Sequence, residues 1–289
     1  MDTKPFEYST GKTIWVMAVY FLLFLAGDLL SSLVFDVLFR FFTPSGTQWY
    51  AIWRMLGNLL VTFLLFWMYT TKILHLKLKN FRIGFGVQPW GILLAALLPA
   101  CVVGAYLMAG TAEINAVPVS EMVLIISASA LTALKAGVVE EMLFRGFWMT
   151  LLENRWNRAV AVLAPSFLFS LAHLPSMEQF TLAGVLLLVL SGTLVGIMFS
   201  LTTYRGNTIG NSVLLHAVWN FVMVTGIVHI TTPQGAYGDP LVSITLSTEN
   251  ILLTGGGFGV EASLVSIVGY ALVCVAVLIP GNGKPGPSR

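Results

Sequence analysis

The chain has 289 residues, of which 57% are hydrophobic and 10% are charged, and its mean hydropathy is +0.86. These values lie outside the range of soluble globular proteins and predict an integral membrane protein surrounded by lipid. The 15 basic and 13 acidic residues give a net charge of +2 without a dense basic cluster, which argues against nucleic acid as a partner.

Eight apolar runs are long enough to cross about 30 Å of hydrocarbon at about 1.5 Å per residue. In chain order they cover residues 14–41, 49–73, 90–110, 120–152, 157–174, 180–203, 208–230 and 262–279. The runs are rich in Leu, Ala, Met and Phe and lack the regular alternation of outer-membrane strands. We therefore expect an all-α fold, a polytopic bundle of about eight transmembrane helices that forms a single membrane domain over residues 1–289.

The distribution of basic residues predicts the orientation of this bundle. With a cytoplasmic amino terminus, most of the 15 Lys and Arg residues fall on the inner side. The segment 231–261 then lies outside, and it contains Asp239, Glu249 and Glu261 but no Lys or Arg. We expect a multi-pass protein of the cell (inner) membrane with both termini in the cytoplasm.

Two adjacent glutamates, Glu140 and Glu141, lie within the fourth apolar run. Adjacent side chains on a helix point about 100° apart, so the two carboxylates should have different roles. Glu141 and Arg145 are four residues apart, with the acid nearer the amino end, which favours an ion pair on one helix face. Glu140 remains free for chemistry, and a carboxylate in an apolar site suits a general base that takes a proton from water.

Two further pairs lie four residues apart on later apolar runs: Phe169 with His173, and His216 with Asn220. His173 is a candidate partner of Glu140, because imidazole also exchanges protons near neutral pH. A neutral His216 N–H and the Asn220 amide are the kind of donors that an oxyanion hole requires. Each pair taken alone is also compatible with ordinary hydrogen bonding between helices.

The motifs E-E-x-x-x-R, F-x-x-x-H and H-x-x-x-N, in this order, resemble the CPBP family of CAAX proteases and bacteriocin-processing (Abi) proteins, which includes the Rce1-type CAAX endopeptidases. The similarity covers about residues 130–221, the expected catalytic core. It implies an eight-helix intramembrane peptidase in which the first glutamate and first histidine activate water, while the second histidine and the asparagine stabilise the oxyanion. The corresponding residues are Glu140, His173, His216 and Asn220, supported by Glu141, Arg145 and Phe169.

The expected reaction is hydrolysis of a peptide bond without a cofactor. An alternative is a zinc site formed by Glu140, His173 and His216, although the chain has no H-E-x-x-H motif. The substrate is a peptide or protein; the resemblance suggests a prenylated CAAX protein, and leader peptides are an alternative. A transporter would also contain buried charges, but it would be expected to show an internal repeat, and none is detected. A non-catalytic membrane scaffold or bacteriocin-immunity protein, in which the fold serves as a binding platform, is a further alternative.

Straight helices perpendicular to the membrane would place these residues at different depths. Counted from the inner boundary, Glu140 and His173 lie about 20 to 25 Å deep and His216 about 12 Å deep. Straight, upright helices would not bring them to one level, so tilt, a kink or a shifted boundary is required.

Overall fold

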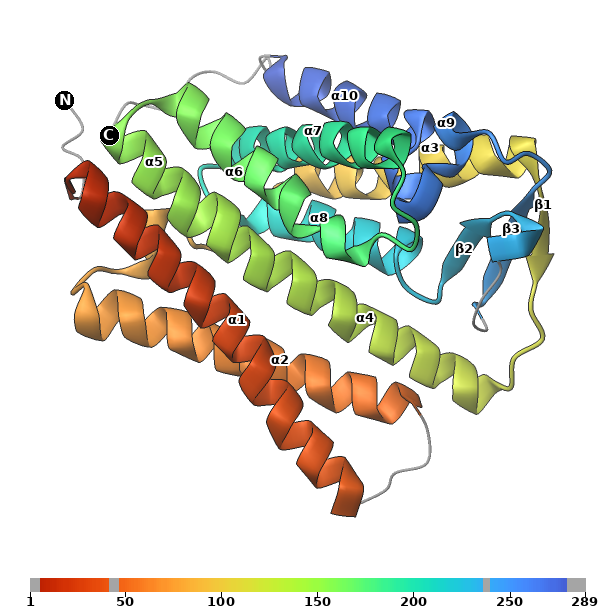
Figure 1. Ribbon diagram of the computed structural model, residues 1–289, viewed down its shortest axis with the longest axis horizontal. Coiled ribbons are helices and arrows are strands. Elements are labelled where there is room, and N and C mark those ends of the chain that lie inside the picture. Colours follow the sequence, from red (N-terminus) through yellow and green to blue (C-terminus); the bar gives the residue numbers. More distant parts are fainter. Residues whose placement is uncertain (1–5, 42–46, 236–239, 280–289) are drawn as a thin grey trace.

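Long apolar helices form most of the structure, a computed structural model that describes residues 6–41, 47–235 and 240–279 (Figure 1). The helices are α1 (Thr10–Phe41), α2 (Thr47–Met68), α3 (Pro89–Ala109), α4 (Val119–Glu141), α5 (Met149–Arg155), α6 (Arg158–Ala172), α7 (Leu182–Gly206), α8 (Gly210–Met223), α9 (Ile251–Thr254) and α10 (Leu264–Leu278). A π-helical segment, Met142–Trp148, joins α4 to α5, so that Val119–Arg155 is one continuous helical rod.

In the described residues, six helical segments are long and apolar enough to cross a membrane. They are Thr10–Phe41, Gln48–Ile73, Pro89–Ala109, Val119–Arg155, Arg158–Ser176 and Leu182–Gly206. The expected polytopic helical bundle is therefore confirmed. The remaining two predicted spans correspond to the shorter helices α8 and α10, so the count of eight stays a prediction.

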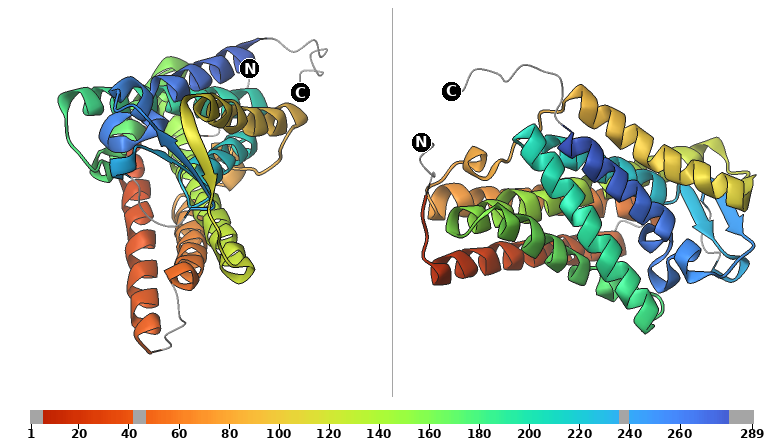
Figure 2. Two further views of the ribbon diagram at one scale, coloured as in Figure 1. Left: turned by 90° about the vertical axis from the view of Figure 1, so that its right-hand side faces the viewer. Right: turned by 90° about the horizontal axis from the view of Figure 1, so that it is seen from above.

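α4 runs through the middle of the bundle, with α1 and α2 on one side and α3, α7 and α10 on the other (Figure 1 and Figure 2). Large apolar side chains such as Leu22, Leu29 and Leu33 are more than half exposed on α1. Such a surface is unfavourable in water and suits contact with lipid tails.

Side-chain caps explain where three helices begin. Asn157 accepts a hydrogen bond from Val160 N at the start of α6, and Thr181 accepts one from Gly184 N at the start of α7. Ser263 caps α10 in the same way by accepting from Ser266 N. Each cap satisfies one backbone donor that the first turn of a helix leaves free.

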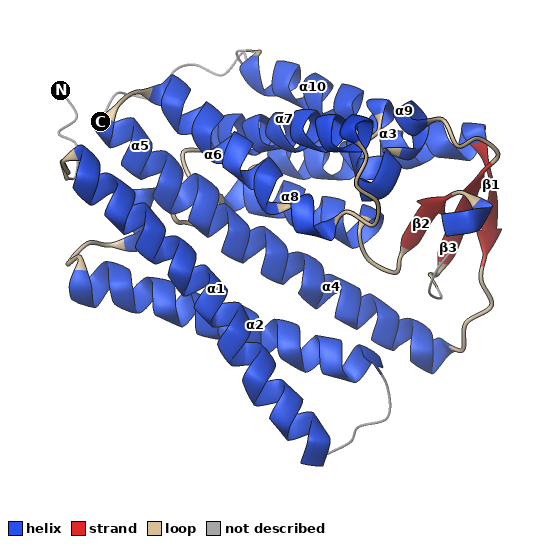
Figure 3. Cartoon of the chain, in the orientation of Figure 1, coloured by secondary structure: helices blue, strands red, loops and turns tan. Residues whose placement is uncertain are grey.

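A small sheet covers one end of the bundle, opposite the end where α1 begins (Figure 3). Its strands are β1 (Gly110–Ile114), β2 (Val228–Thr231) and β3 (Val242–Leu246); β3 lies in the centre, antiparallel to β1 and parallel to β2. The sequence did not predict this sheet, because each strand has only four or five residues and pairs with a segment distant in the chain. The expected seventh span, 208–230, is consequently wrong at its carboxyl end: α8 stops at Met223 and β2 begins at Val228.

Small residues allow the central helices to approach each other closely. A Cβ atom added to Gly137 on α4 would lie 2.9 Å from the Val213 carbonyl oxygen and 3.1 Å from the Ala217 Cβ on α8. Gly192 and Gly196 on α7 face α6 in the same way, with Ser170 and Ser166 at 2.7 Å. Close contact between small residues is a principal source of helix association in membranes.

Gly137→Ala should therefore push α4 and α8 apart. We expect a loss of about 1 to 3 kcal/mol in the free energy of unfolding, because the new methyl group overpacks a filled interface. Denaturation of the purified protein in mixed micelles measures this. Gly104→Ala on α3 is the control, since a Cβ there meets nothing within 4 Å. An equal loss in the two variants would contradict the close-packing explanation.

Candidate active site

The carboxyl end of α4 carries a fully buried ion pair. Arg145 Nη1 lies 3.0 Å from Glu141 Oε1, and both side chains are 0% exposed. Arg145 Nη2 also donates to the Gly196 carbonyl on α7, at 3.2 Å. The pair predicted from the i, i+4 spacing is present, and pairing of this kind compensates two charges that are removed from water.

His216 on α8 joins this pair to Glu140. Its Nδ1 lies 3.0 Å from Glu141 Oε1, and its Nε2 lies 3.9 Å from Glu140 Oε2. The two adjacent glutamates therefore approach one imidazole ring from opposite sides. Glu140 is 16% exposed, and its Oε2 atom is buried without a hydrogen bond to any described residue.

Aromatic rings enclose the charged groups. Phe199 stacks on His216 at a centroid distance of 4.7 Å, and Phe169 packs edge-on to the same ring at 6.0 Å. The Arg145 guanidinium lies 4.6 Å from the Phe169 centroid and 5.2 Å from that of Phe199. Such contacts stabilise a cation that is shielded from water.

His173 lies at the carboxyl end of α6, beside the ring of Phe169. Its Nδ1 lies 2.8 Å from the Phe169 carbonyl oxygen, and its ring lies 4.5 Å from the Phe169 ring. A carbonyl oxygen only accepts, so Nδ1 must donate, and the Nε2 of the neutral ring carries a free lone pair.

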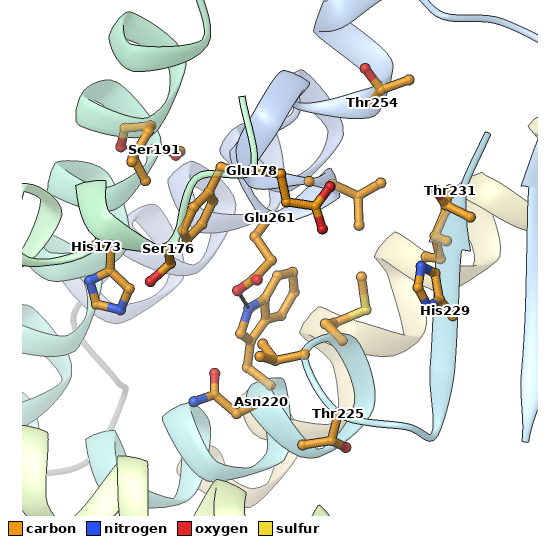
Figure 4. A pocket seen from close by; sticks show the side chains of 18 of the residues that line it. His173, Ser176, Glu178, Ser191, Asn220, Thr225, His229, Thr231, Thr254 and Glu261 are labelled. Atoms are coloured by element: carbon orange, nitrogen blue, oxygen red, sulfur yellow. Dashed lines mark hydrogen bonds between the residues drawn. The ribbon is translucent and has the colours of Figure 1, made fainter. Parts of the chain in front are cut away.

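A cavity of about 970 Å³ brings the motifs on α6 and α8 together. Phe169, His173, His216 and Asn220 all line it, and Figure 4 shows His173 and Asn220 beside the same space. The loops at the sheet end of the bundle supply much of the remaining wall. Glu140 is not among the lining residues; it reaches the cavity wall through its approach to His216.

The sequence did not identify Glu261 as a residue of this site. Its Oε2 accepts a hydrogen bond from Trp219 Nε1 at 3.2 Å, and both residues line the cavity (Figure 4). Burial raises the pKa of the Glu261 carboxyl to about 7, while the Trp219 hydrogen bond and His216 partly offset this rise. Glu261 belongs to no i, i+4 motif, so no local sequence pattern indicated its role.

The depth disagreement is resolved by where the helices begin and end. Glu140 stands 15 residues before the end of α5 at Arg155, about 22 Å at 1.5 Å per residue, whereas His216 is six residues, about 9 Å, into α8. Since the two side chains approach within 3.9 Å, α8 begins deeper in the bundle than α5 ends.

The zinc alternative requires Glu140, His173 and His216 to converge on one point. In the described part of the chain, no group of three His, Cys, Asp or Glu residues is arranged to hold a metal ion. Protein ligands of zinc must lie about 2.0 to 2.3 Å from one point. The choice between a metal-free mechanism and a zinc site of Glu140, His173 and His216 stays a prediction.

The structure is that of an integral membrane protein whose helical bundle contains a polar centre of carboxylates and histidines. Residues 122–222, about a third of the chain, match the family model described as type II CAAX prenyl endopeptidase Rce1-like. This match confirms the resemblance drawn from the three motifs and supports a CAAX prenyl protease-like peptidase. A comparison with curated proteins found no match to the chain.

Glu141→Gln should strongly destabilise the protein, because it leaves the Arg145 charge buried without its partner. The expected loss is about 3 to 5 kcal/mol in the free energy of unfolding, measured by denaturation in micelles. Glu153→Gln is the control: Glu153 pairs with Arg82 at 2.8 Å, but both side chains are 22 to 23% exposed. For such a pair we expect about 1 kcal/mol or less. Similar losses in the two variants would contradict a structural role for the buried pair.

Proposed function

We propose that this protein is an intramembrane endopeptidase of the CAAX type that hydrolyses a peptide bond with water activated by Glu140. The observation that carries the proposal is the convergence of three motifs, from α4, α6 and α8, around one imidazole and one cavity. The family match over residues 122–222 supports the same class of reaction.

Glu140 is proposed as the general base. Its Oε2 atom is buried and accepts no hydrogen bond from the described residues, which leaves a lone pair for the proton of a water molecule. Water transfers one proton to this carboxylate while its oxygen attacks the substrate carbonyl carbon. A positioned base contributes typically about 10² to 10⁴ to the rate of such a step.

His173 is proposed to orient and help activate the same water. Its Nδ1 donates to the Phe169 carbonyl, so Nε2 of the neutral ring accepts a hydrogen bond from water. The Phe169 ring packs against both imidazoles, at 4.5 Å from His173 and 6.0 Å from His216.

The oxyanion is proposed to be stabilised by Asn220 and His216. The Asn220 amide supplies N–H donors at the cavity wall. His216 donates from Nδ1 to Glu141, so its Nε2 becomes a donor only when the ring carries both protons. This refines the expectation from the sequence, in which a neutral His216 was sufficient.

A prenylated protein is the proposed substrate. A second, apolar cavity of about 460 Å³ lies between α2, α4 and α8, and Phe63, Val138 and Val213 line it. Val138 is two residues from Glu140, and Val213 is three from His216. An isoprenoid chain in this cavity would bury apolar area next to the site. Cleavage of a leader peptide is the alternative, and it would not need this cavity.

We further propose that the protein lies in the cell (inner) membrane with both termini in the cytoplasm. The excess of Lys and Arg on one side supports this orientation. α1 begins, and α10 ends, toward the end of the bundle that lies opposite the sheet (Figure 1).

Glu140→Gln should abolish cleavage while the protein remains folded. Gln keeps the shape of Glu140 but does not accept a proton at neutral pH, so we expect a rate loss of about 10² or more. The measurement compares the peptide termini of the membrane proteome in cells with wild-type or variant protein at equal abundance. Glu121→Gln, on the exposed face of the same helix, is the control and should cleave normally.

The same comparison separates a protease from a scaffold or immunity protein. If termini present with wild-type protein vanish with Glu140→Gln, the protease is supported and its substrate is identified. If Glu140→Gln leaves every terminus unchanged and supports the full cellular phenotype, the protein acts by binding, and the proposed function is wrong.

Chelation should leave the activity intact. Because Glu140, His173 and His216 are not arranged as metal ligands, we expect cleavage rates within about twofold with and without a strong zinc chelator. The assay uses purified protein in lipid and a fluorogenic prenylated peptide. Loss of activity with chelator and its recovery on adding zinc would contradict the metal-free mechanism.

A further inference from the structure

The cavity contains a carboxyl group that the proposed mechanism does not use. Glu261 belongs to the 3-10 turn Val260–Ala262, which precedes α10, and its side chain lines the cavity (Figure 4). Its Oε2 accepts a hydrogen bond from Trp219 Nε1 at 3.2 Å. Trp219 is the neighbour of Asn220 in the chain, so Glu261 faces the segment of α8 that carries the proposed oxyanion donor.

The backbone around Glu261 is fixed by side chains from two helices. Tyr270 on α10 donates its hydroxyl to the Glu261 carbonyl oxygen at 3.2 Å, and its ring packs at 5.2 Å from that of Trp219. Ser266 donates to the Val260 carbonyl at 2.7 Å, and Tyr106 on α3 donates to Ser263 Oγ at 2.7 Å. A carboxyl group held this way has a defined position before a substrate enters.

The described residues that line the cavity around Glu261 include no Lys or Arg. The titratable groups that interact with it are His216 on α8 and Tyr270 on α10. The cavity is also lined by His173, Glu178, His229 and Glu249. An ionised carboxylate is unfavourable in such a site, and burial raises the pKa of Glu261 to about 7.

We propose that Glu261 is a further substrate-binding residue of this site, whose protonated carboxyl group donates a hydrogen bond to a carbonyl oxygen of the peptide in the cavity. Trp219 holds the Oε2 atom as an acceptor, so the O–H on the other oxygen is the donor that remains. The proposal rests on the proposed function, because it assumes that a peptide occupies this cavity.

The pH dependence follows from the two protonation states. The neutral form, which donates to the peptide, predominates below the pKa of about 7. Above that pH the ionised carboxylate faces the peptide carbonyl with acceptors only, and binding weakens. Glu261→Gln keeps an N–H₂ donor of similar shape and does not titrate. Peptide binding by this variant should therefore not weaken as the pH rises.

The test measures binding of a rhodamine-labelled, farnesylated CAAX peptide to the full chain in lipid nanodiscs. Glu140→Ala protein is used so that the peptide stays intact. We expect the Kd of this protein to rise about tenfold from about pH 6 to about pH 8.5, and that of the Glu140→Ala/Glu261→Gln protein to change by less than about threefold over the same range. Equal thermal midpoints for the two proteins at about pH 6 confirm that both are folded.

Two further variants separate binding from structural support. Trp219→Phe removes the hydrogen-bond donor that favours the ionised form of Glu261. The pH at which peptide binding weakens should therefore be higher in this variant. Glu178→Gln changes another carboxyl of the same cavity and should leave the pH dependence unchanged. The histidines of the cavity are present in every variant, so a difference between the proteins reports on Glu261.

The inference is overturned if Glu261→Gln retains the pH dependence of its parent, if binding by the parent does not vary with pH, or if no binding is detected at any pH. Cleavage of the same peptide by protein with Glu140 intact tests the proposed function separately. If cleavage requires Glu140 but Glu261→Gln does not change the pH dependence of binding, the proposed function is supported and the inference about Glu261 is wrong. Binding with the expected pH dependence but without cleavage supports the role of Glu261 and contradicts the proposed function.

Discussion

The ion pair between Glu141 and Arg145 is the interaction on which the rest of the site depends. Both side chains are fully buried, so separating them would leave an uncompensated charge in an apolar interior. Glu141 Oε1 also accepts a hydrogen bond from His216 Nδ1 on α8, while Arg145 donates one to the Gly196 carbonyl oxygen on α7. One buried pair therefore fixes three helices relative to each other, and the π-helical segment that follows Glu141 contains its basic partner.

Close packing makes these contacts possible. Gly137 brings α4 onto α8, and Gly196 brings α7 onto α6, at distances that a side chain would prevent. In a membrane, apolar surface alone does not drive helices together, because lipid tails are equally apolar. Small residues and buried polar contacts therefore determine which helices meet. Here they hold the Glu140 carboxylate 3.9 Å from His216, with its Oε2 atom buried and without a hydrogen bond to any described residue.

Much of the cavity wall comes from a different part of the chain than the motifs. The helices that carry the motifs form its floor, whereas the strand β2 and the loops around 249–261 form much of its wall. Glu261 enters from this wall and contacts α8 through Trp219. The proposed chemistry and the proposed recognition of the peptide are thus contributed by separate segments, which would allow the wall to vary while the charged centre stays the same.

Sequence patterns predicted the helical membrane fold, the ion pair of Glu141 with Arg145, and the shared helix faces of Phe169 with His173 and His216 with Asn220. These features are local: they follow from apolar run length and from the 3.6-residue period of a helix. Three other features could not be predicted in this way: the position of His216 between both glutamates, the pairing of residues 110–114 with 242–246, and the presence of Glu261 in the cavity wall. Those contacts join distant segments and depend on where each helix begins and how closely it packs, which no local period encodes.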